Sequence, residues 1–397
     1  MTLSVEQAIE DLKQGKMLIV TDDQSRENEG DLVYPAQIIT QEQVNFIITV
    51  AKGLLCVSME KDRAQRLDLD LMTAQNTSLH HTSFTVSVDA LQGTTTGISA
   101  KDRATTIRRL ADENAKPEDF GRPGHVFPLI SKVGGVLRRQ GHTEAVTDLL
   151  KIAGLTPVGA LCEILDEEGN AARMPALEEL SQKYGIGIVT IEDLIAYRHR
   201  IEKLVNQILV TKLPSKYGDF NLHLFENQVD DKIHLALVKG DVTTPEPVLL
   251  RVHDECLTGD VLGSLRCDCG EQLAAALRAI EKEGRGVLLY MKQEGRGIGL
   301  VEKLRAYVLQ DQGYDTVEAN LKLGHKPDER DYGIGAQILS SLGIRKMRLM
   351  TNNPRKIVGL SAFGLEIVER VPLQVGLNEH NIHYLKTKEK KMGHIFM

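Results

Sequence analysis

Three of the chain's five cysteines, Cys256, Cys267 and Cys269, lie within a stretch of fourteen residues. Their C-x10-C-x-C spacing differs from the paired C-x2-C of zinc ribbons, and the other two cysteines are in the first half of the chain. Three thiolates on a tetrahedral ion leave one position open, as a catalytic zinc that holds and acidifies a water requires. Cys269 also precedes a predicted helix, whose N-terminus favours a thiolate. A structural site completed by His253, or three unrelated buried thiols, are the alternatives.

Three cationic loops follow the cysteines: EGR at 294–296 after a predicted strand, ERD at 329–331, and TNNPRK at 351–356. Arginine and lysine side chains in loops suit phosphate oxygens. Each loop alone is typical of a turn or a solvated face. Together with the cysteines they indicate a site for an anionic substrate.

The first half contains carboxylates at a spacing of two, Glu27, Glu29 and Asp31 in RENEGD. In an extended segment these side chains share one side, and oxygen ligands at that density suit Mg²⁺ or Mn²⁺. Further along, RRQGHTEA places Arg139 and His142 ahead of a predicted helix. A solvated acidic loop and a structural histidine are the commoner meanings of such patterns.

These residues require elements that position them. Hydrophobic periodicity in the first half predicts a helix over 5–13, a strand over 17–20, a helix over 41–53 closed by Gly53, strands over 54–59 and 84–90, and a helix carrying Val146, Leu149, Leu150 and Ala153 with Gly154 as its cap.

The second half begins after a predicted connecting helix over 190–207. It reads as an antiparallel hairpin over 220–227 and 232–241, a helix over 271–284, a strand over 287–293, a glycine-rich loop and a helix over 301–313. The fold class is therefore α/β (α+β), with a mixed sheet and helices in each half. The chain shows no internal repeat.

Length and charge narrow the functional classes. A chain of 397 residues exceeds one hydrophobic core, so we expect two domains, 1–200 and 201–397. A formal net charge of -7 disfavours a nucleic-acid or membrane partner, including the alternative of a zinc-containing nucleic-acid-binding protein that uses TNNPRK and the lysines of 386–391. The only apolar run near the start, residues 17–20, is too short for a signal or spanning helix, so we expect a cytoplasmic protein.

Residues from about 205 to the end resemble GTP cyclohydrolase II of riboflavin biosynthesis. The matching stretches are RVHDECLTGDVLGSLRCDCG, LLYMKQEGRGIGL, VLQDQGYDTVEAN, KPDERDYGIGAQIL and LMTNNPRK. The resemblance implies Cys256, Cys267 and Cys269 as zinc ligands, Asp328 as proton acceptor and Arg330 as nucleophile toward the α-phosphate. Because a guanidinium is effectively always protonated, a purely charge-stabilising Arg330 is the alternative. The implied GTP contacts are Arg251, Val252, His253, Asp254, Glu255, Gln272, Glu294, Gly295, Arg296, Thr316, Thr351 and Lys356, and Mg²⁺ is expected to accompany the GTP.

Residues 1 to about 200 resemble 3,4-dihydroxy-2-butanone 4-phosphate synthase, which makes riboflavin's four-carbon unit from ribulose 5-phosphate. The matching stretches include RENEGDLV, GLLCVSM, GTTTGISAKDRATTI and RRQGHTEAVTDLLKIAGL. The resemblance implies Glu27 and His142 as ligands of Mg²⁺ or Mn²⁺, and His125 and Glu163 as further essential groups. Cys56 either lines the pocket or is an inert thiol. The implied substrate contacts are Arg26, Glu27, Asp31, Arg139, Gln140, Gly141, His142 and Thr143.

The two resemblances together imply a bifunctional riboflavin-pathway enzyme that releases formate in both reactions. Its GTP reaction yields pyrophosphate and a pyrimidinone, and its ribulose 5-phosphate reaction yields the four-carbon phosphate. The family also implies a homodimer formed through the first domain. A more cautious alternative is that only one half is active.

Overall fold

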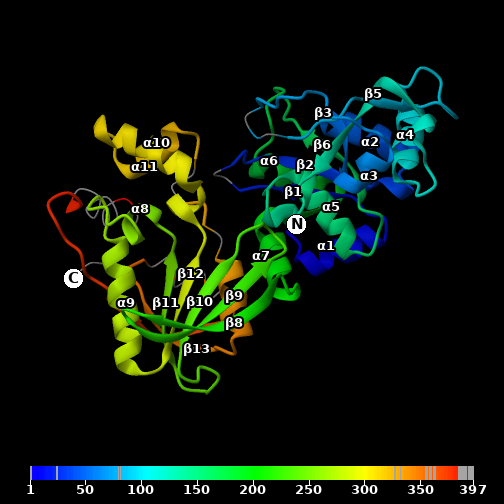
Figure 1. Ribbon diagram of the computed structural model, residues 1–397. Coiled ribbons are helices and arrows are strands. Elements are labelled where there is room, and N and C mark those ends of the chain that lie inside the picture. Colours follow the sequence, from blue (N-terminus) through cyan, green and yellow to red (C-terminus); the bar gives the residue numbers. More distant parts are fainter. Residues whose placement is uncertain are drawn as a thin grey trace. The chain divides into compact units, whose positions relative to one another are not determined.

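The computed structural model describes residues 2–23, 26–78, 80, 82–325, 328–330, 332–353, 356, 360, 364–382 and 391. By its internal contacts the chain divides into two compact units, residues 1–198 and residues 199–397. Figure 1 shows both units. In the part of the chain that the structure describes, no helix has the length and apolar character needed to cross a membrane.

Unit 1 is built around one mixed sheet. Its described strands lie in the order β4-β5-β3-β6-β2-β1-β7, with β1 parallel to β7 and antiparallel to β2. The strands are β1 (Leu18–Thr21), β2 (Gly30–Pro35), β3 (Lys52–Glu60), β4 (Val88–Ala90), β5 (Phe120–Ser131), β6 (Val158–Ile164) and β7 (Gly187–Thr190). The helices are α1 (Val5–Lys13), α2 (Gln41–Val50), α3 (Lys61–Arg66), α4 (Ala100–Ala111), α5 (His142–Ile152), α6 (Met174–Tyr184) and α7 (Ile191–Ile201), with short 3-10 turns at 36–38, 117–119 and 135–137.

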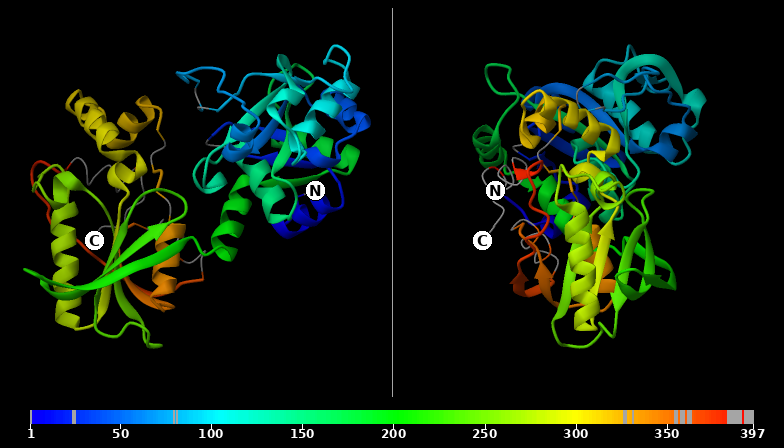
Figure 2. Two further views of the ribbon diagram at one scale, coloured as in Figure 1. Left: turned by 45° about the vertical axis from the view of Figure 1, so that its right-hand side comes forward. Right: turned by 60° about the vertical axis from the view of Figure 1, so that its left-hand side comes forward.

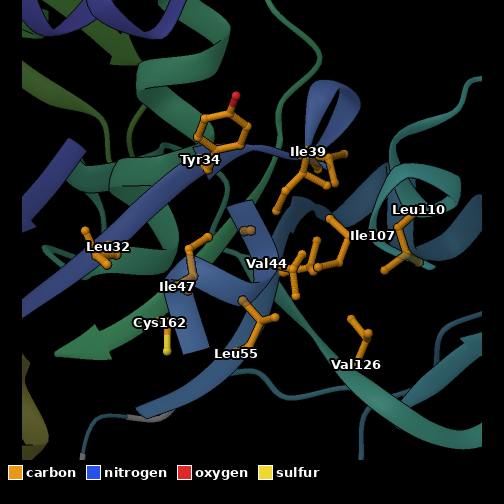
Figure 3. Packing of buried hydrophobic residues seen from close by; sticks show 14 of the residues in the cluster. Leu32, Tyr34, Ile39, Val44, Ile47, Leu55, Ile107, Leu110, Val126 and Cys162 are labelled. Carbon is orange, nitrogen blue, oxygen red and sulfur yellow. The ribbon is translucent and has the colours of Figure 1, made fainter. Parts of the chain in front are cut away.

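Two hydrophobic clusters occupy opposite faces of this sheet, because successive side chains of a strand point to opposite sides. On one face Ile19 and Leu32 pack with Val44 and Ile47 of α2 and with Ile107 of α4. Figure 3 shows this cluster, in which Ile47, Val44 and Ile107 lie between the helices and the sheet. On the other face Leu18, Val20 and Val33 pack with residues of α1 and α5. Unit 1 is therefore a three-layer α/β/α structure.

Unit 2 contains a second mixed sheet, whose described strands lie in the order β14-β13-β11-β12-β10-β9-β8. Strands β8, β9, β10 and β12 are antiparallel neighbours, and β12, β11, β13 and β14 run parallel. The strands are β8 (Val205–Ser215), β9 (Gly218–Asn227), β10 (His234–Lys239), β11 (Val248–Asp254), β12 (Gly286–Met291), β13 (Lys346–Met350) and β14 (Glu366–Val371). The helices are α8 (Leu257–Asp260), α9 (Cys269–Glu283), α10 (Gly299–Asp311), α11 (Thr316–Lys322) and α12 (Gly333–Ser341), with a 3-10 turn at 294–297.

Helices α9 and α12 cover opposite faces of this second sheet (Figure 1 and Figure 2). Leu277 and Ile280 of α9 pack against Leu249 and Leu288. Strands β11 and β12 are parallel, so their carboxyl ends meet at one edge of the sheet. Helices α8 and α10 follow these two ends in the chain and lie at that edge (Figure 1). Such an edge is where open α/β sheets bind ligands.

Both mixed-sheet predictions are confirmed, and three element predictions are wrong in detail. The helix expected over 41–53 ends at Val50, and Gly53 lies inside β3, where a Cβ would come within 2.2 Å of the Glu163 carbonyl oxygen. Of the strand expected over 84–90, Val88–Ala90 forms the strand β4, while Phe84 and Thr85 make isolated bridges to Leu129 and Leu71.

The helix expected over 190–207 ends at Ile201, because the following residues pair with β9 as strand β8. The predicted domain boundary after residue 200 and the division after Arg198 both fall within α7. The expected glycine cap is confirmed: Gly154, with a left-handed φ of 72°, follows the C-cap residue Ala153 of α5, and the next N–H, of Leu155, returns to the Leu150 carbonyl oxygen.

Candidate active sites

The three cysteines of unit 2 converge. Cys256 follows β11, and Cys267 and Cys269 stand at the start of α9. Their sulfur atoms all lie within 4.8 Å of one another, and Sγ of Cys256 is 3.7 Å from Sγ of Cys267. A Cβ at Gly259 would lie 2.9 Å from the Cys267 sulfur, so this position leaves no room for a side chain. Hydrogen bonds among the three thiols lower the pKa of Cys256 and raise the pKa values of Cys267 and Cys269, so Cys256 is the first of the three to ionise.

His253 does not complete a closed four-ligand site. Its buried ring turns Nε2 toward Asp260, 3.0 Å from Oδ1, and stacks on Tyr290. Among the described residues the group of clustered ligand atoms here consists of the three sulfurs. A donor set of three sulfurs that line a cleft fits a zinc ion that retains an exchangeable position.

Two cations contact Asp254 at the end of β11. Nζ of Lys356 lies 2.7 Å from Asp254 Oδ2 and donates to the Val252 carbonyl oxygen at 2.8 Å. Nη1 of Arg330 lies 2.7 Å from the same carboxylate oxygen. Burial opposes the ionisation of Asp254, but Lys356 and Arg330 outweigh it and hold the pKa of this carboxyl well below its usual range. One carboxylate thus orders two of the cations beside the cysteines.

Arg330 is held by a second carboxylate as well. Its Nε donates to Asp328 Oδ1 at 2.7 Å. Burial disfavours the guanidinium charge, yet Asp254 and Asp328 together raise the pKa of Arg330 well above its ordinary value. Asp328 therefore fixes the orientation of the Arg330 guanidinium.

One cleft joins the cysteines and the cations. It holds about 1090 Å³ with its open mouth included. Of the residues predicted to bind GTP, Val252 is the one outside its lining, because its side chain is buried in the sheet on β11. The other predicted contacts line it: Arg251, His253, Asp254, Glu255, Gln272, Glu294, Gly295, Arg296, Thr316, Thr351 and Lys356. Two further residues of the predicted TNNPRK loop, Pro354 and Arg355, fall outside the described residues.

Two residues of α10 that no sequence motif indicated, Lys303 and Tyr307, line the same cleft. Nζ of Lys303 lies 2.7 Å from Glu294 Oε1 and 3.1 Å from the Cys256 sulfur. Arg266 lies over the Tyr307 ring, 5.1 Å from its centroid. Lys303 and Tyr307 are four residues apart in a predicted helix, so they lie on one helix face. This spacing was the sequence feature that could have identified them.

The acidic segment of unit 1 also forms a site. One ligand atom each from Asp22, Glu27 and His142 lies within 4.8 Å of the others. Nδ1 of His142 is 3.8 Å from Glu27 Oε2 and 4.0 Å from Asp31 Oδ1. Nε2 of His142 and Oδ1 of Asp31 are buried without a hydrogen-bond partner. Unpaired buried polar atoms among carboxylates fit a divalent cation.

Electrostatics of this site follow from burial and from like charges. Burial and the neighbouring carboxylates, Glu163 first among them, raise the pKa of Asp31 well above its usual range. Burial lowers the pKa of His142, which keeps the ring neutral and able to ligate a metal. A cation would relieve the repulsion among the carboxylates.

The cleft around this acidic site holds about 560 Å³ with its open mouth included, half the volume of the cleft in unit 2. Its lining includes the predicted residues Arg26, Glu27, Asp31, Arg139, His142, Thr143 and Glu163. Cys56 lines it too, and burial raises the pKa of its thiol, so it is a protonated wall residue. Gln140 and Gly141 are outside the lining, although Gly141 caps the helix that carries His142.

His125 lies elsewhere in unit 1. Its Nδ1 is 2.7 Å from Asp89 Oδ2, and it does not line the cleft. Gly97, with a left-handed φ of 98°, packs against this pair: a Cβ there would lie 2.5 Å from the His125 ring nitrogen. The structure of one chain therefore does not bring His125 to the acidic cleft.

Asp22 is the residue of this site that sequence reasoning missed. Its carboxylate accepts the backbone N–H groups of Glu27 at 3.0 Å and Glu29 at 2.9 Å, and pairs with Arg26 at 2.8 Å. It therefore shapes the loop that presents the carboxylates. The sequence feature that could have identified Asp22 was its position directly after the strand β1.

Two family models match the chain. One, described as 3,4-dihydroxy-2-butanone 4-phosphate synthase, matches residues 6–197, and the other, described as GTP cyclohydrolase II, matches residues 206–372. The riboflavin biosynthesis protein RibBA of Chlorobium phaeovibrioides is 58% identical over 393 residues, which cover 99% of this chain and 96% of that protein. The counterpart in Bacillus cytotoxicus is 59% identical over 98% of each chain. A crystal structure of RibBX from A. baumannii, titled as a two-domain 3,4-dihydroxy-2-butanone 4-phosphate synthase, is 36% identical with a TM-score of 0.75, and covers 93% of this chain and 99% of that one.

Proposed function

The chain belongs to the bifunctional riboflavin biosynthesis family that joins a 3,4-dihydroxy-2-butanone 4-phosphate synthase domain to a GTP cyclohydrolase II domain, and from this premise we propose which residues perform each reaction. Residues 1–200 convert ribulose 5-phosphate to the four-carbon phosphate and formate. Residues 201–397 open the guanine ring of GTP and release formate and pyrophosphate. The observation that carries the second assignment is one cleft lined by three clustered thiols and by buried cations.

In the GTP reaction we assign the zinc ion to Cys256, Cys267 and Cys269. When bound, zinc would supply Lewis-acid activation for the hydrolysis at carbon 8 of the purine. Arg251, Arg330 and Lys356 bind the phosphates, and Mg²⁺ accompanies the triphosphate. Because Arg251 donates to the carbonyl oxygen of Met350 at 2.8 Å and to Gln272 at 2.5 Å, it is oriented before the substrate arrives.

We assign Arg330 to charge stabilisation rather than to nucleophilic attack. A guanidinium must lose a proton before it can act as a nucleophile. The two carboxylates beside Arg330 raise its pKa and so oppose this deprotonation. Asp328 then has a positioning role, since its carboxylate holds the Nε side of the guanidinium.

In the ribulose 5-phosphate reaction we assign Glu27 and His142, with Asp22, to a magnesium or manganese ion. The ion would stabilise the negative charge of enediolates. Arg26 and Arg139 line the cleft as phosphate contacts, with Thr143 beside them. Asp31 accepts a proton more readily than an exposed aspartate because burial raises its pKa, which suits a group that moves protons beside a carbonyl.

We propose that unit 1 acts as a homodimer. The reason is His125, which is essential in the family pattern but does not line the cleft of its own chain. A partner subunit is the remaining source of this histidine. Mixing inactive His125→Ala and Glu163→Gln chains should restore part of the activity, because one mixed site carries both natural residues. No recovery on mixing two folded variants would refute the shared site.

The test of the bifunctional assignment is formate release from each substrate alone. Cys267→Ser should abolish release from GTP and spare release from ribulose 5-phosphate, and His142→Ala should do the reverse. Cys162→Ala, in the hydrophobic core of unit 1 and outside both linings, is a matched control. Loss of both activities in either site variant would refute independent sites. Because the A. baumannii structure is titled for the synthase alone, GTP turnover by the wild-type chain needs its own measurement.

A further inference from the structure

A buried lysine stands beside the cysteine cluster of unit 2. Lys303 projects from α10 and is 9% exposed. Its ammonium group contacts three acceptors: Cys256 Sγ at 3.1 Å, Thr258 Oγ1 at 3.0 Å and Glu294 Oε1 at 2.7 Å. An ammonium group has three N–H donors, so all of them are used within the cleft. Lys303 is therefore not available as a freely moving phosphate ligand.

Glu294 extends this contact to the backbone. Its other oxygen, Oε2, accepts the N–H of Leu257 at 2.7 Å, in the residue that follows Cys256. Its Oε1 also accepts the N–H of Gly295 at 3.0 Å. Glu294 thus has both oxygens occupied and joins Lys303 to the turn that carries the first cysteine. Glu294 therefore has a structural role in this site that does not depend on contact with GTP.

The contacts of Lys303 also bear on the net charge of the cysteine cluster. Three thiolates and one divalent ion leave one net negative charge in a cleft that is partly closed to water. A cation within hydrogen-bonding distance of a thiolate offsets that charge. Nζ of Lys303 is paired in this way with two anionic groups at once, Glu294 and the Cys256 sulfur.

We propose that Lys303 is a positioning residue of the metal site: its ammonium group donates to the Cys256 sulfur, ties it to Thr258 and Glu294, and offsets the charge of the thiolate cluster. The inference rests on the proposed zinc site and adds a residue outside the three ligands. A hydrogen bond to a ligating sulfur withdraws electron density from it, so Lys303 sets both how firmly the ion is held and how strongly the thiolates donate to it.

The test compares Lys303→Met, which keeps the length and removes the charge, with Lys303→Arg, which keeps the charge. Lys239→Met is a matched control, because Lys239 also pairs with a glutamate at 2.7 Å but lies on β10 and outside the cleft. Zinc affinity is measured by competition with a chromophoric chelator. The thiolate-to-metal charge-transfer absorption is measured on protein loaded with Co²⁺. Thermal unfolding of the metal-free proteins checks the fold.

We expect Lys303→Met to weaken zinc binding by at least about tenfold, the range for residues that hold a metal ligand in place. We also expect its Co²⁺ absorption band to move to lower energy, since the thiolates become more electron-rich, and Lys303→Arg to recover part of both changes. Wild-type affinity and an unchanged Co²⁺ spectrum in Lys303→Met would overturn the proposal while leaving the zinc site intact. A wild-type chain that binds neither metal would instead refute the proposed zinc site itself.

Thr258→Val provides a second route if Lys303→Met does not fold. It removes one of the three acceptors of Lys303 and leaves the charge in place. We expect a smaller change of the Co²⁺ band in either position or intensity, because the ammonium group is then less firmly directed at the sulfur. An unchanged spectrum in this variant would count against the positioning role.

Discussion

Lys356 gives the GTP cleft a pH dependence that can be worked out from its surroundings. Its side chain is 5% exposed and donates to Asp254 and to a backbone carbonyl. Burial lowers the pKa of Lys356 to about 8, with Asp254 opposing the shift and Arg330 adding to it. Raising the pH through this range therefore removes one positive charge from the proposed phosphate site.

The size of the effect follows from this pKa. About nine in ten Lys356 side chains are charged at pH 7, and about one in ten at pH 9. A bound triphosphate favours the charged form, so binding takes up a proton above pH 8. The apparent dissociation constant should therefore rise about tenfold between pH 7 and pH 9 and approach a slope of one log unit per pH unit.

Calorimetry with 7-deaza-GTP, whose five-membered ring lacks the nitrogen of the reactive imidazole, measures affinity without turnover. Repeating it in buffers of different ionisation enthalpy counts the protons taken up. Lys356→Arg is the control, because an arginine stays charged throughout this range while the ligand titrates identically. A wild-type affinity that follows the Lys356→Arg curve from pH 7 to pH 9 would refute the reasoning.

Stability has the opposite dependence on pH. The folded pKa of about 8 is below the ordinary value of 10.5, so between these values the unfolded chain binds more protons than the folded one. The free energy of unfolding of ligand-free unit 2 should therefore rise with pH in this window relative to Lys356→Arg. The limit is roughly 3 kcal/mol, because the pKa falls from 10.5 to about 8 and each pH unit corresponds to about 1.36 kcal/mol. Urea unfolding at pH 7.5 and pH 9.5 measures it.

Three further perturbations test the rest of the molecule. Asp22→Ala removes the acceptor of two backbone N–H groups and should weaken Mg²⁺ binding and abolish formate release from ribulose 5-phosphate while GTP turnover is kept; normal synthase activity would contradict its role. Gly97→Ala should lower the synthase activity because its Cβ would collide with Asp89 and His125, and a variant with wild-type kcat and an unmoved His125 in a crystal structure would exclude that contact. Ile47→Ala, at a fully buried position, should destabilise unit 1 by about 2–5 kcal/mol in urea unfolding without changing GTP turnover; a change below about 1 kcal/mol would contradict the packing.

Sequence patterns predicted the parts of the fold whose signal is local. The helices α1, α5 and α9 have clear 3.6-residue periodicity, and they form close to the predicted residues. Strand β8 was not predicted, because its residues are mostly exposed and show no alternation of buried and exposed side chains. Its backbone finds hydrogen-bond partners only when β9 pairs with it. Sheet order in both units also depends on distant segments, and no local pattern encodes it.

The candidate sites divide in the same way. Motifs placed the clustered cysteines, the cations and the acidic loop in order along the chain, and the structure brings most of them into two clefts. Lys303 and Asp22 were missed because their importance lies in contacts with residues that the motifs already contained. A lysine in a helix and an aspartate after a strand are unremarkable until Cys256 and the backbone of Glu27 are seen beside them.

Both clefts contain buried anionic groups, but the charge of these groups is balanced differently in the two units. In unit 1 several carboxylates crowd around a neutral histidine, and Asp31 has an unpaired buried oxygen, so the site itself demands a cation. In unit 2 two of the anionic groups already have cationic partners: Asp254 has Lys356 and Arg330, and Cys256 has Lys303. An empty first site should therefore be destabilised by its own charges and gain stability when Mg²⁺ binds. The second site is organised before its substrate arrives, which is the condition for stabilising a transition state without rearrangement.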